Sequence, residues 1–562
     1  MKEAKLAKKH SYRHITRYGE IISVLVKYGF GDLLSRISLE KYFSFGKKSF
    51  KVRKKEKIEE ISHWDRIRLA IEELGPAFIK LGQFVSNRPD ILPPDLIESL
   101  EKLQDSVAPF PYEEADEIIK KEFGISADGL FDEFCKEPIA SGSMSQVYRA
   151  VLTSGEEVAV KVQRPRIDSI IAVDLEIMYN LTSLIERHIH AFQMYNLTQL
   201  VEEFAGAVQK ELDFTIEALH GENFRNNFKD DQTVFIPKVY TEFTTKKVIT
   251  TDFVKGIKVS NVQGLLEAGL DPKLIAKRGA DLILKQIFMF GFFHADPHPG
   301  NILVKDGNVV CFLDLGMTGI ITPASREKLG LIILGITERD PRKIVRVLYS
   351  MSDIAKENRE EFEYEIAELI QEYCARPLAE INIGEVLNRL SRILYVNKLR
   401  VIPGFYLLVK AIVTIEGIGY RLDPQFDLMS HLKPFASRLI REQISPVHLV
   451  NLGYSSLVDL LYFVRDFPSE AMDVFQLTKS GKMKFVFEHQ GLEPVLKRFD
   501  MFVNRIVFGL VLASLIIGSS IVILSDIPPK LYGLPVIGIA GFIAAAIMGF
   551  WLLISILHHE RM

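Results

Sequence analysis

The sequence predicts an α+β fold in which helices come first, short strands follow and the remainder is mostly helical. Apolar residues recur at helical spacing from Trp64 to Glu122 and from Ile167 to Asn226. β-branched and polar residues alternate from Gln146 to Val162 and from Val234 to Phe253, as they do in half-buried strands. After Asp314 the pattern is helical to about Gln490. We therefore expect a mixed sheet region followed by a helical region.

The first helical stretch contains two breaks, at Gly75-Pro76 and at Pro93-Pro94. Proline at the first position of a helix is favourable, so we expect new helices to begin there. On the helix after Pro76, Lys80 and Gln83 share one face, and Gly82 would permit close approach of another backbone.

Length and composition indicate a globular protein of more than one unit. The chain has 562 residues, of which 48% are hydrophobic and 25% charged, so we expect two or three structural units. A net charge of −3 argues against a nucleic-acid partner. The cysteines, Cys135, Cys311 and Cys374, are scattered, which excludes a disulfide framework or a cysteine zinc site and suits a reducing compartment.

The N-terminal region is strongly basic between Lys2 and Lys57 and lacks the apolar core of a secretory signal. Up to about Leu39 its apolar residues have helical spacing. A basic amphipathic helix on anionic lipid and a helix packed on the protein are equally consistent with this pattern. Lys47 to Lys57 is expected to be a charged linker.

The C-terminal region contains two uncharged apolar runs, Ile506–Leu524 and Leu534–Leu557. Each is long enough to cross a hydrocarbon core of about 30 Å, so a transmembrane hairpin is favoured over two buried helices of a soluble domain. Lys497, Arg498 and Arg505 precede the first run, which places both chain ends in the cytoplasm by the positive-inside rule.

Small residues recur at every fourth position of the second run, at Gly541, Ala545 and Gly549. The first run has a similar pair, Gly509 and Ala513. Such residues would let the two helices approach closely or let two chains dimerise.

Two short motifs point to phosphoryl transfer. Asp296 and Asn301 belong to His-Ala-Asp-Pro-His-Pro-Gly-Asn, and Asp314 follows in Leu-Asp-Leu-Gly. A kinase catalytic loop has the same Asp-x-x-x-x-Asn pattern before a metal-binding aspartate. Transfer requires a carboxylate beside the attacking hydroxyl, and amide and carboxylate oxygens to hold Mg²⁺. A plain polar turn is the alternative, but the position of Asp314 favours a kinase-like catalytic loop.

The nucleotide side of such a site is expected around Lys161, which ends the apolar strand from Val158. The preceding segment, Ala140-Ser141-Gly142-Ser143, takes the place of a glycine-rich loop, where small residues let backbone amides approach phosphate. The lysine also needs a carboxylate partner. Three candidates remain open beyond the helical insertion: Glu211, Asp213 and Glu217.

In combination these motifs resemble the UbiB/AarF/ADCK family of atypical protein-kinase-like proteins. The Lys-x-Gly-Gln at Lys80–Gln83, the loop at 140–143, Lys161, the Glu-x-Asp at Glu211–Asp213 and the loop at Asp296 match in order. The resemblance covers about Ile15 to Leu422, and the hairpin looks like that of bacterial members. It implies a bilobal protein-kinase-like fold with a helical N-terminal extension across the active site and a C-terminal transmembrane helical hairpin.

The resemblance also implies roles for individual residues. Asp296 and Lys161 would be catalytic, Glu217 would be the partner of Lys161, and Asn301 and Asp314 would bind Mg²⁺. Gating and nucleotide contacts would come from the remaining motif residues: Lys80, Gln83, Glu211 and Asp213 for the gate, and Ala140, Ser141, Gly142 and Ser143 for the nucleotide. The family loop is usually alanine-rich, so Ser141 and Gly142 depart from it.

The implied function is a membrane-anchored ATPase or kinase that binds Mg-ATP and supports synthesis of ubiquinone or a related isoprenoid lipid. Its partners would be membrane lipid, quinone precursors or quinone-biosynthesis proteins, with a homodimer as a further possibility. It would lie in the inner membrane with the kinase-like part in the cytoplasm. A protein kinase and a non-catalytic, ATP-switched scaffold or lipid chaperone are the alternatives. The expected domains are 1–57 (basic segment), 58–135 (extension), 136–255 (N-lobe), 256–500 (C-lobe) and 501–562 (membrane helices).

Overall fold

The computed structural model divides the chain into two compact units, residues 1–451 and 452–562. The residues that it describes are 16–31, 61–86, 88, 92–103, 107–189, 196–350, 359–374, 383–396, 403–443, 465, 472, 493–525, 527–531 and 534–559. The linker predicted at Lys47–Lys57 and the basic residues before Thr16 lie outside the described part of the chain.

Residues 16–27 form a helix that packs on the protein. Its Ile21 and Ile22 are buried. The Arg17 guanidinium binds both carboxylate oxygens of the buried Asp174 on α9 (Ile167–His188), at 2.7 and 2.9 Å. It also donates to the Leu74 carbonyl at 2.6 Å. Of the two interpretations left open by the sequence, the structure supports the packed helix for this stretch.

The extension consists of four successive helices: α4 (His63–Leu74), α5 (Pro76–Ser86), α6 (Pro94–Leu100) and α7 (Tyr112–Phe123). As expected, α5 and α6 begin at the two predicted breaks, but the break between α6 and α7 was not predicted. The Ser62 hydroxyl caps α4 by accepting from Asp65 N at 3.1 Å. A Cβ at Gly82 of α5 would lie 2.4 Å from Leu103 Cδ1, so this glycine permits close approach of a side chain rather than of the backbone that we expected.

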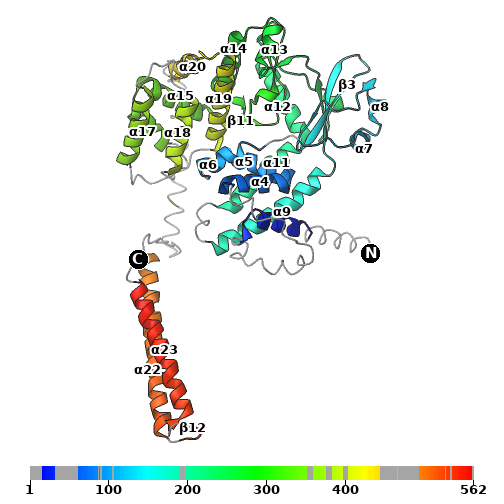
Figure 1. The fold of residues 1–562 in the computed structure, drawn as a ribbon. Coiled ribbons are helices and arrows are strands. Elements are labelled where there is room, and N and C mark those ends of the chain that lie inside the picture. Colours follow the sequence, from blue (N-terminus) through cyan, green and yellow to red (C-terminus); the bar gives the residue numbers. More distant parts are fainter. Residues whose placement is uncertain are drawn as a thin grey trace. The chain divides into compact units, whose positions relative to one another are not determined.

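A five-stranded sheet follows, in the order β1-β3-β4-β6 with β2 paired to β3 (Figure 1). Alternate valines of β4 (158, 160 and 162) are buried beneath α7 and α8, so the intervening residues face the opposite side of the sheet. The strands and the short helix are β1 (Glu133–Phe134), β2 (Ala140–Ser141), β3 (Ser145–Val151), β4 (Glu157–Gln163), β6 (Val248–Asp252) and α8 (Ala127–Leu130).

The expected helical insertion lies between β4 and β6 as α9, α11 (Leu197–Glu211) and α12 (Phe214–Asn227). Buried apolar residues of α5, α9 and α11 form one hydrophobic core, to which Phe78 and Phe204 contribute. The second predicted strand region is only partly extended, because it contains β5 (Val234–Phe235), a 3₁₀ turn, η2 (Thr241–Phe243), and β6.

A second sheet has the order β5-β10-β9-β7, and β8 pairs separately with β11. The β9–β10 turn has Gly307 and Asn308 at φ 75° and 59°, the left-handed backbone that a tight hairpin requires. These elements are β7 (Ile257–Lys258), β8 (Phe292–His294), η4 (Pro299–Asn301), β9 (Ile302–Lys305), β10 (Val309–Phe312) and β11 (Thr318–Ile320).

Helices surround this second sheet and share one large hydrophobic core with it. Figure 1 shows α14, α15, α19 and α20 gathered in this region. The helical pattern predicted after Asp314 is confirmed in the described residues up to Gln443. The helices are α13 (Val262–Glu267), α14 (Pro272–Lys285) with its π-helical end η3 (Gln286–Phe290), α15 (Pro323–Glu338), α16 (Pro341–Tyr349), α17 (Arg359–Cys374), α18 (Ile383–Val396), α19 (Pro403–Leu422) and α20 (Leu428–Gln443).

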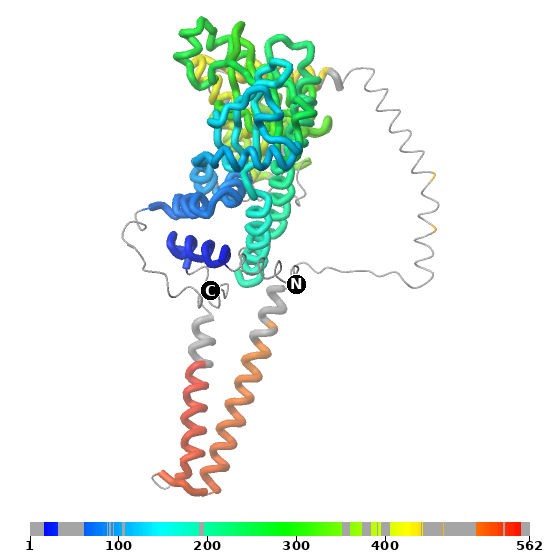
Figure 2. The backbone as a smooth tube through the Cα atoms, turned by 90° about the vertical axis from the view of Figure 1, so that its right-hand side faces the viewer, coloured from blue at the N-terminus to red at the C-terminus, as the bar shows by residue number. Residues whose placement is uncertain are grey.

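The second unit contains α22 (Glu493–Leu524) and α23 (Val536–His559), which lie side by side (Figure 2). The short strands β12 (Lys530–Leu531) and β13 (Leu534–Pro535) pair between them. A Cβ at Gly541 would lie 2.1 Å from Ser519 Oγ, so this glycine permits close helix packing. Among the described residues one segment, Phe502–Leu524, is long and apolar enough to cross a membrane, whereas the apolar part of α23, Val536–Trp551, is shorter.

Candidate functional site

Lys161 is held in the middle of the first sheet. It lies on β4, which pairs with β3 on one side and β6 on the other, so that Lys161 stands between Val147 and Ile249. The strand cannot shift without losing both ladders. At the end of β4, the Gln163 amide donates to the Leu212 carbonyl at 2.9 Å and ties the α11–α12 junction to the sheet.

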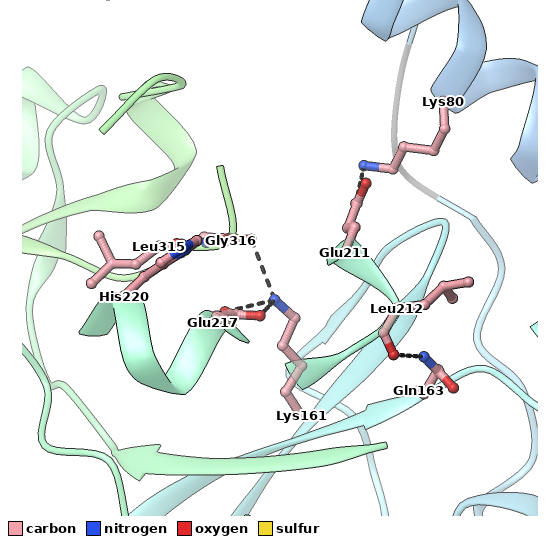
Figure 3. A network of polar contacts seen from close by, with 10 residues as sticks. Lys80, Lys161, Gln163, Glu211, Leu212, Glu217, His220, Leu315 and Gly316 are labelled. Carbon is pink, nitrogen blue, oxygen red and sulfur yellow. Dashed lines mark hydrogen bonds and ion pairs between the residues drawn. The ribbon is translucent and has the colours of Figure 1, made fainter. Parts of the chain in front are cut away.

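The Lys161 ammonium forms ion pairs with Glu217 and Asp314. Figure 3 shows its contact with Glu217. Its Nζ lies 2.9 Å from each carboxylate oxygen of Glu217 and 3.5 Å from Asp314 Oδ2. Of the three acids that the residues alone left open, the structure brings Glu217 to the lysine. Asp213 instead caps α12, accepting from Thr215 N at 3.1 Å.

The charged groups of this cluster shift one another's pKa values. The Lys161 ammonium lowers the pKa of Asp314 to about 2, against the effect of burial. Burial alone would lower the pKa of Lys161, but the carboxylates of Asp314 and Glu217 outweigh it and raise that pKa above 10.5. Burial raises the pKa of Glu217. A cationic lysine beside an ionised Asp314 suits phosphate and metal binding.

The loop with Asp296 is a turn held by its own hydrogen bonds. His298 N donates to the Asp296 carbonyl at 2.7 Å, and Asn301 N donates to the His298 carbonyl at 2.8 Å. Gly300 N donates to His298 Nδ1 at 3.0 Å. The loop follows β8 and precedes β9, so the short strand β8 separates it from α14 and its π-helical end η3.

Asn301 and Asp314 lie at the same end of the β9–β10 hairpin. Leu313 N donates to the Asn301 carbonyl at 2.9 Å, one residue beyond the paired strands. One oxygen of Asp314 accepts from Gly316 N at 3.0 Å, and 45% of its side chain is exposed. An ionised, partly exposed carboxylate at the same hairpin end as an asparagine fits Mg²⁺, which takes few protein ligands and completes its shell with water and phosphate.

The small-residue loop is fixed by Arg164, which our sequence analysis did not identify. Arg164 donates to the Gly142 carbonyl at 2.7 Å, to Ser141 Oγ at 2.8 Å and to the Ala108 carbonyl at 3.0 Å. Gly142 N donates to the Ser145 carbonyl at 2.9 Å, so this amide is already bonded within the loop. A Cβ on Gly142 would meet that carbonyl at 3.7 Å, an ordinary contact, so the loop does not require glycine there. Ala140 pairs with Val147 at its start, and Ser143 is buried.

The extension reaches this site through Lys80 of α5. Its Nζ lies 2.6 Å from Glu211 Oε1 at the end of α11 (Figure 3). The positive charge of Lys80 contributes to the lowered pKa of Asp314. Gln83 follows on the same helix, and its carbonyl accepts from Ser86 Oγ at 2.8 Å.

Two further residues that sequence reasoning missed contact the motif residues. His220 lies on α12 one turn after Glu217, and its Nδ1 is 3.2 Å from the Leu315 carbonyl oxygen. Burial lowers the pKa of His220, so it is neutral near pH 7. Lys410 on α19 lies 3.2 Å from Asp296 Oδ1. No local sequence pattern marks either residue, because each acts across a long chain separation.

Comparison with known proteins agrees with this architecture. The chain matches ABC1 atypical kinase-like domains over residues 102–348, UbiB helical domains over 366–427 and ABC1/UbiB kinase-like C-terminal domains over 490–558. An uncharacterized protein in the hydrogenase 1 5′ region of Clostridium pasteurianum is 32% identical, over 97% of this chain and 99% of its own length. The probable protein kinase UbiB of Marinobacter nauticus is 35% identical, over 75% of this chain and 78% of its own.

The chain belongs to the ABC1/UbiB family of atypical kinase-like proteins. The resemblance inferred from its motifs is thereby confirmed, as is a kinase-like fold of mixed helices and strands. A solved chain of Mycobacterium tuberculosis, Rv3197 in complex with erythromycin, is 21% identical over 66% of this chain and 93% of its own, with a TM-score of 0.48. A likeness at that level bears on neither ligand nor activity.

Proposed function

We propose that this ABC1/UbiB member is a membrane-anchored ATPase or small-molecule kinase that binds Mg-ATP and supports synthesis of ubiquinone or a related isoprenoid lipid. The observation that carries the proposal is the Lys161–Glu217–Asp314 cluster, which combines a phosphate-binding cation with an ionised metal ligand. The quinone part of the proposal rests on the family resemblance.

In this proposal each motif residue has a distinct task. Lys161 binds the α and β phosphates, and Asp296 accepts the proton of the attacking hydroxyl or water. Asn301 and Asp314 hold Mg²⁺, which would neutralise charge on the phosphates. The Ala140–Ser143 loop, held by Arg164, covers the nucleotide.

The membrane part of the proposal rests on α22 and α23. Phe502–Leu524 is long and apolar enough to serve as an anchor. We propose that α23 crosses as well, in a hairpin with the kinase-like part in the cytoplasm. Gly541 packs against Ser519 within this helix pair, which makes the small-residue face less suited to a homodimer contact.

The Lys80–Glu211 ion pair favours a small acceptor over a polypeptide. It holds α5 beside the nucleotide cluster, where a protein substrate would need room to dock. A non-catalytic, ATP-switched scaffold or lipid chaperone is the second candidate, since the same cluster could bind nucleotide without turning it over.

ATP turnover by the purified full chain tests the proposal. We would measure it with and without anionic liposomes and a quinone-precursor phenol, comparing wild type with Asp314→Asn. Wild type should hydrolyse Mg-ATP and the variant should lose most of that activity. Equal rates in the two proteins would overturn the metal assignment, and nucleotide binding without turnover would support the scaffold.

A further inference from the structure

Lys410 brings a second ammonium group to the proposed active site. Its Nζ lies 3.2 Å from Asp296 Oδ1, and about a third of each side chain is exposed, 34% and 35%. The helix that carries it is firmly anchored, because its neighbours Leu408, Ala411 and Ile412 are buried in the core. The backbone of Lys410 is therefore fixed in place, while its partly exposed side chain can change its partner.

The loop that carries Asp296 is anchored on His294, a buried residue of β8. Asp296 N donates to His294 Nδ1 at 3.3 Å. The aspartate that Lys410 contacts is therefore held in place by a buried side chain.

We propose that Lys410 is a further catalytic residue that binds the terminal phosphoryl group of the nucleotide, an inference that rests on the proposed ATP turnover. The group being transferred must lie beside Asp296, where the attacking oxygen loses its proton. Its negative charge there needs a cation. Lys161 is assigned to the α and β phosphates, whereas Lys410 lies beside Asp296 itself.

In the transfer step, the oxygen of water or of a hydroxyl acceptor forms a bond to the γ-phosphorus, while the bond from that phosphorus to the bridging oxygen of ADP breaks. The proton of the attacking group passes to the Asp296 carboxylate. Lys410 keeps its protons and donates hydrogen bonds to the non-bridging γ oxygens. In moving to these oxygens it leaves Asp296 free to accept.

The ratio of the affinities for ATP and ADP tests this role of Lys410, because only ATP carries the γ-phosphoryl group. The full chain in detergent with Mg²⁺ would be titrated with each nucleotide, and its turnover measured. The variants are Lys410→Met, Lys410→Arg and the control Lys273→Met, a surface lysine 3.8 Å from Asp423. We expect Lys410→Met to raise the Kd for ATP roughly 10-fold and to leave that for ADP within about twofold.

We also expect Lys410→Met to lower kcat by roughly 100-fold, Lys410→Arg to recover part of the preference for ATP, and the control to behave like wild type. A wild-type ATP:ADP affinity ratio in Lys410→Met would overturn the inference, even if its turnover changed. Faster turnover at an unchanged ratio would instead assign Lys410 to restraint of Asp296. Failure of the wild type to bind either nucleotide would overturn the proposed function itself.

Discussion

The Lys161 ammonium is bound symmetrically by Glu217, at 2.9 Å from each carboxylate oxygen. The two residues are separated along the chain by α9 and α11, and they meet because α12 packs against β6 of the same sheet. The ion pair therefore depends on the position of α12 relative to β4, the strand that carries the lysine.

Glu217→Gln should lower ATP turnover by roughly 100-fold, because loss of the carboxylate lets Lys161 move toward Asp314 and away from its phosphate-binding position. Steady-state kinetics with the purified chain would measure this. Glu222→Gln, on the same helix and 3.8 Å from Arg225, is the matched control. Unchanged turnover in Glu217→Gln would show that the ion pair is only structural.

Lys80→Ala should change the ATPase rate or the preference among nucleotides, because it releases α5 from Glu211 beside the site. The control is Lys27→Ala, which removes an ion pair to Glu73 with 54% of the lysine side chain exposed. Such an exposed pair contributes about 0–1 kcal/mol to the free energy of unfolding, so we expect no kinetic effect there. If both variants match wild type, α5 has no gating role.

Asp314 should make stability depend on pH. Its folded-state pKa is lowered from 3.8 to about 2, so the ionised carboxylate stabilises the fold above about pH 3.8. This contribution declines as the pH falls toward about 2. The difference in unfolding temperature between wild type and Asp314→Asn should therefore be smaller at pH 3 than at pH 6. Asp306→Asn, in the exposed β9–β10 turn, is the control; a difference that did not vary with pH would contradict this assignment.

Arg164→Leu should raise the KM for ATP several-fold, because the Ala140–Ser143 loop loses the guanidinium that binds Gly142 and Ser141. Arg149→Leu removes an arginine of the same sheet, 3.0 Å from Glu157, and should leave the KM unchanged. An unaltered KM in Arg164→Leu would mean that the loop keeps its position without the arginine.

Gly319→Ala should destabilise the fold by about 1–3 kcal/mol, because its Cβ would lie 2.2 Å from the buried Phe293 ring. Urea unfolding would measure the change in free energy. At Gly206 of α11 nothing lies within 4 Å of an added Cβ, so Gly206→Ala should be neutral or stabilising. Equal stabilities of the two variants would argue against tight β8–β11 packing.

Much of the local structure could be predicted from the sequence. The breaks at Gly75 and Pro93 became helix ends, and the alternation around Lys161 became the β3–β4 ladder. These features depend on residues close together in the chain. There the conformational preference of the backbone and the periodic spacing of buried residues determine the structure directly. The motif spacing singled out Asn301 and Asp314, and the structure places them at one end of the β9–β10 hairpin.

The sequence by itself thus determined the residue types of the candidate site and the elements that carry them. Only the tertiary structure decided which acid meets Lys161, that Arg164 holds the small-residue loop, and that Lys410 faces Asp296. Each of these contacts joins segments that are distant in the chain. Such contacts depend on how helices and sheets pack, and a charged side chain has no periodic signal that reveals its partner.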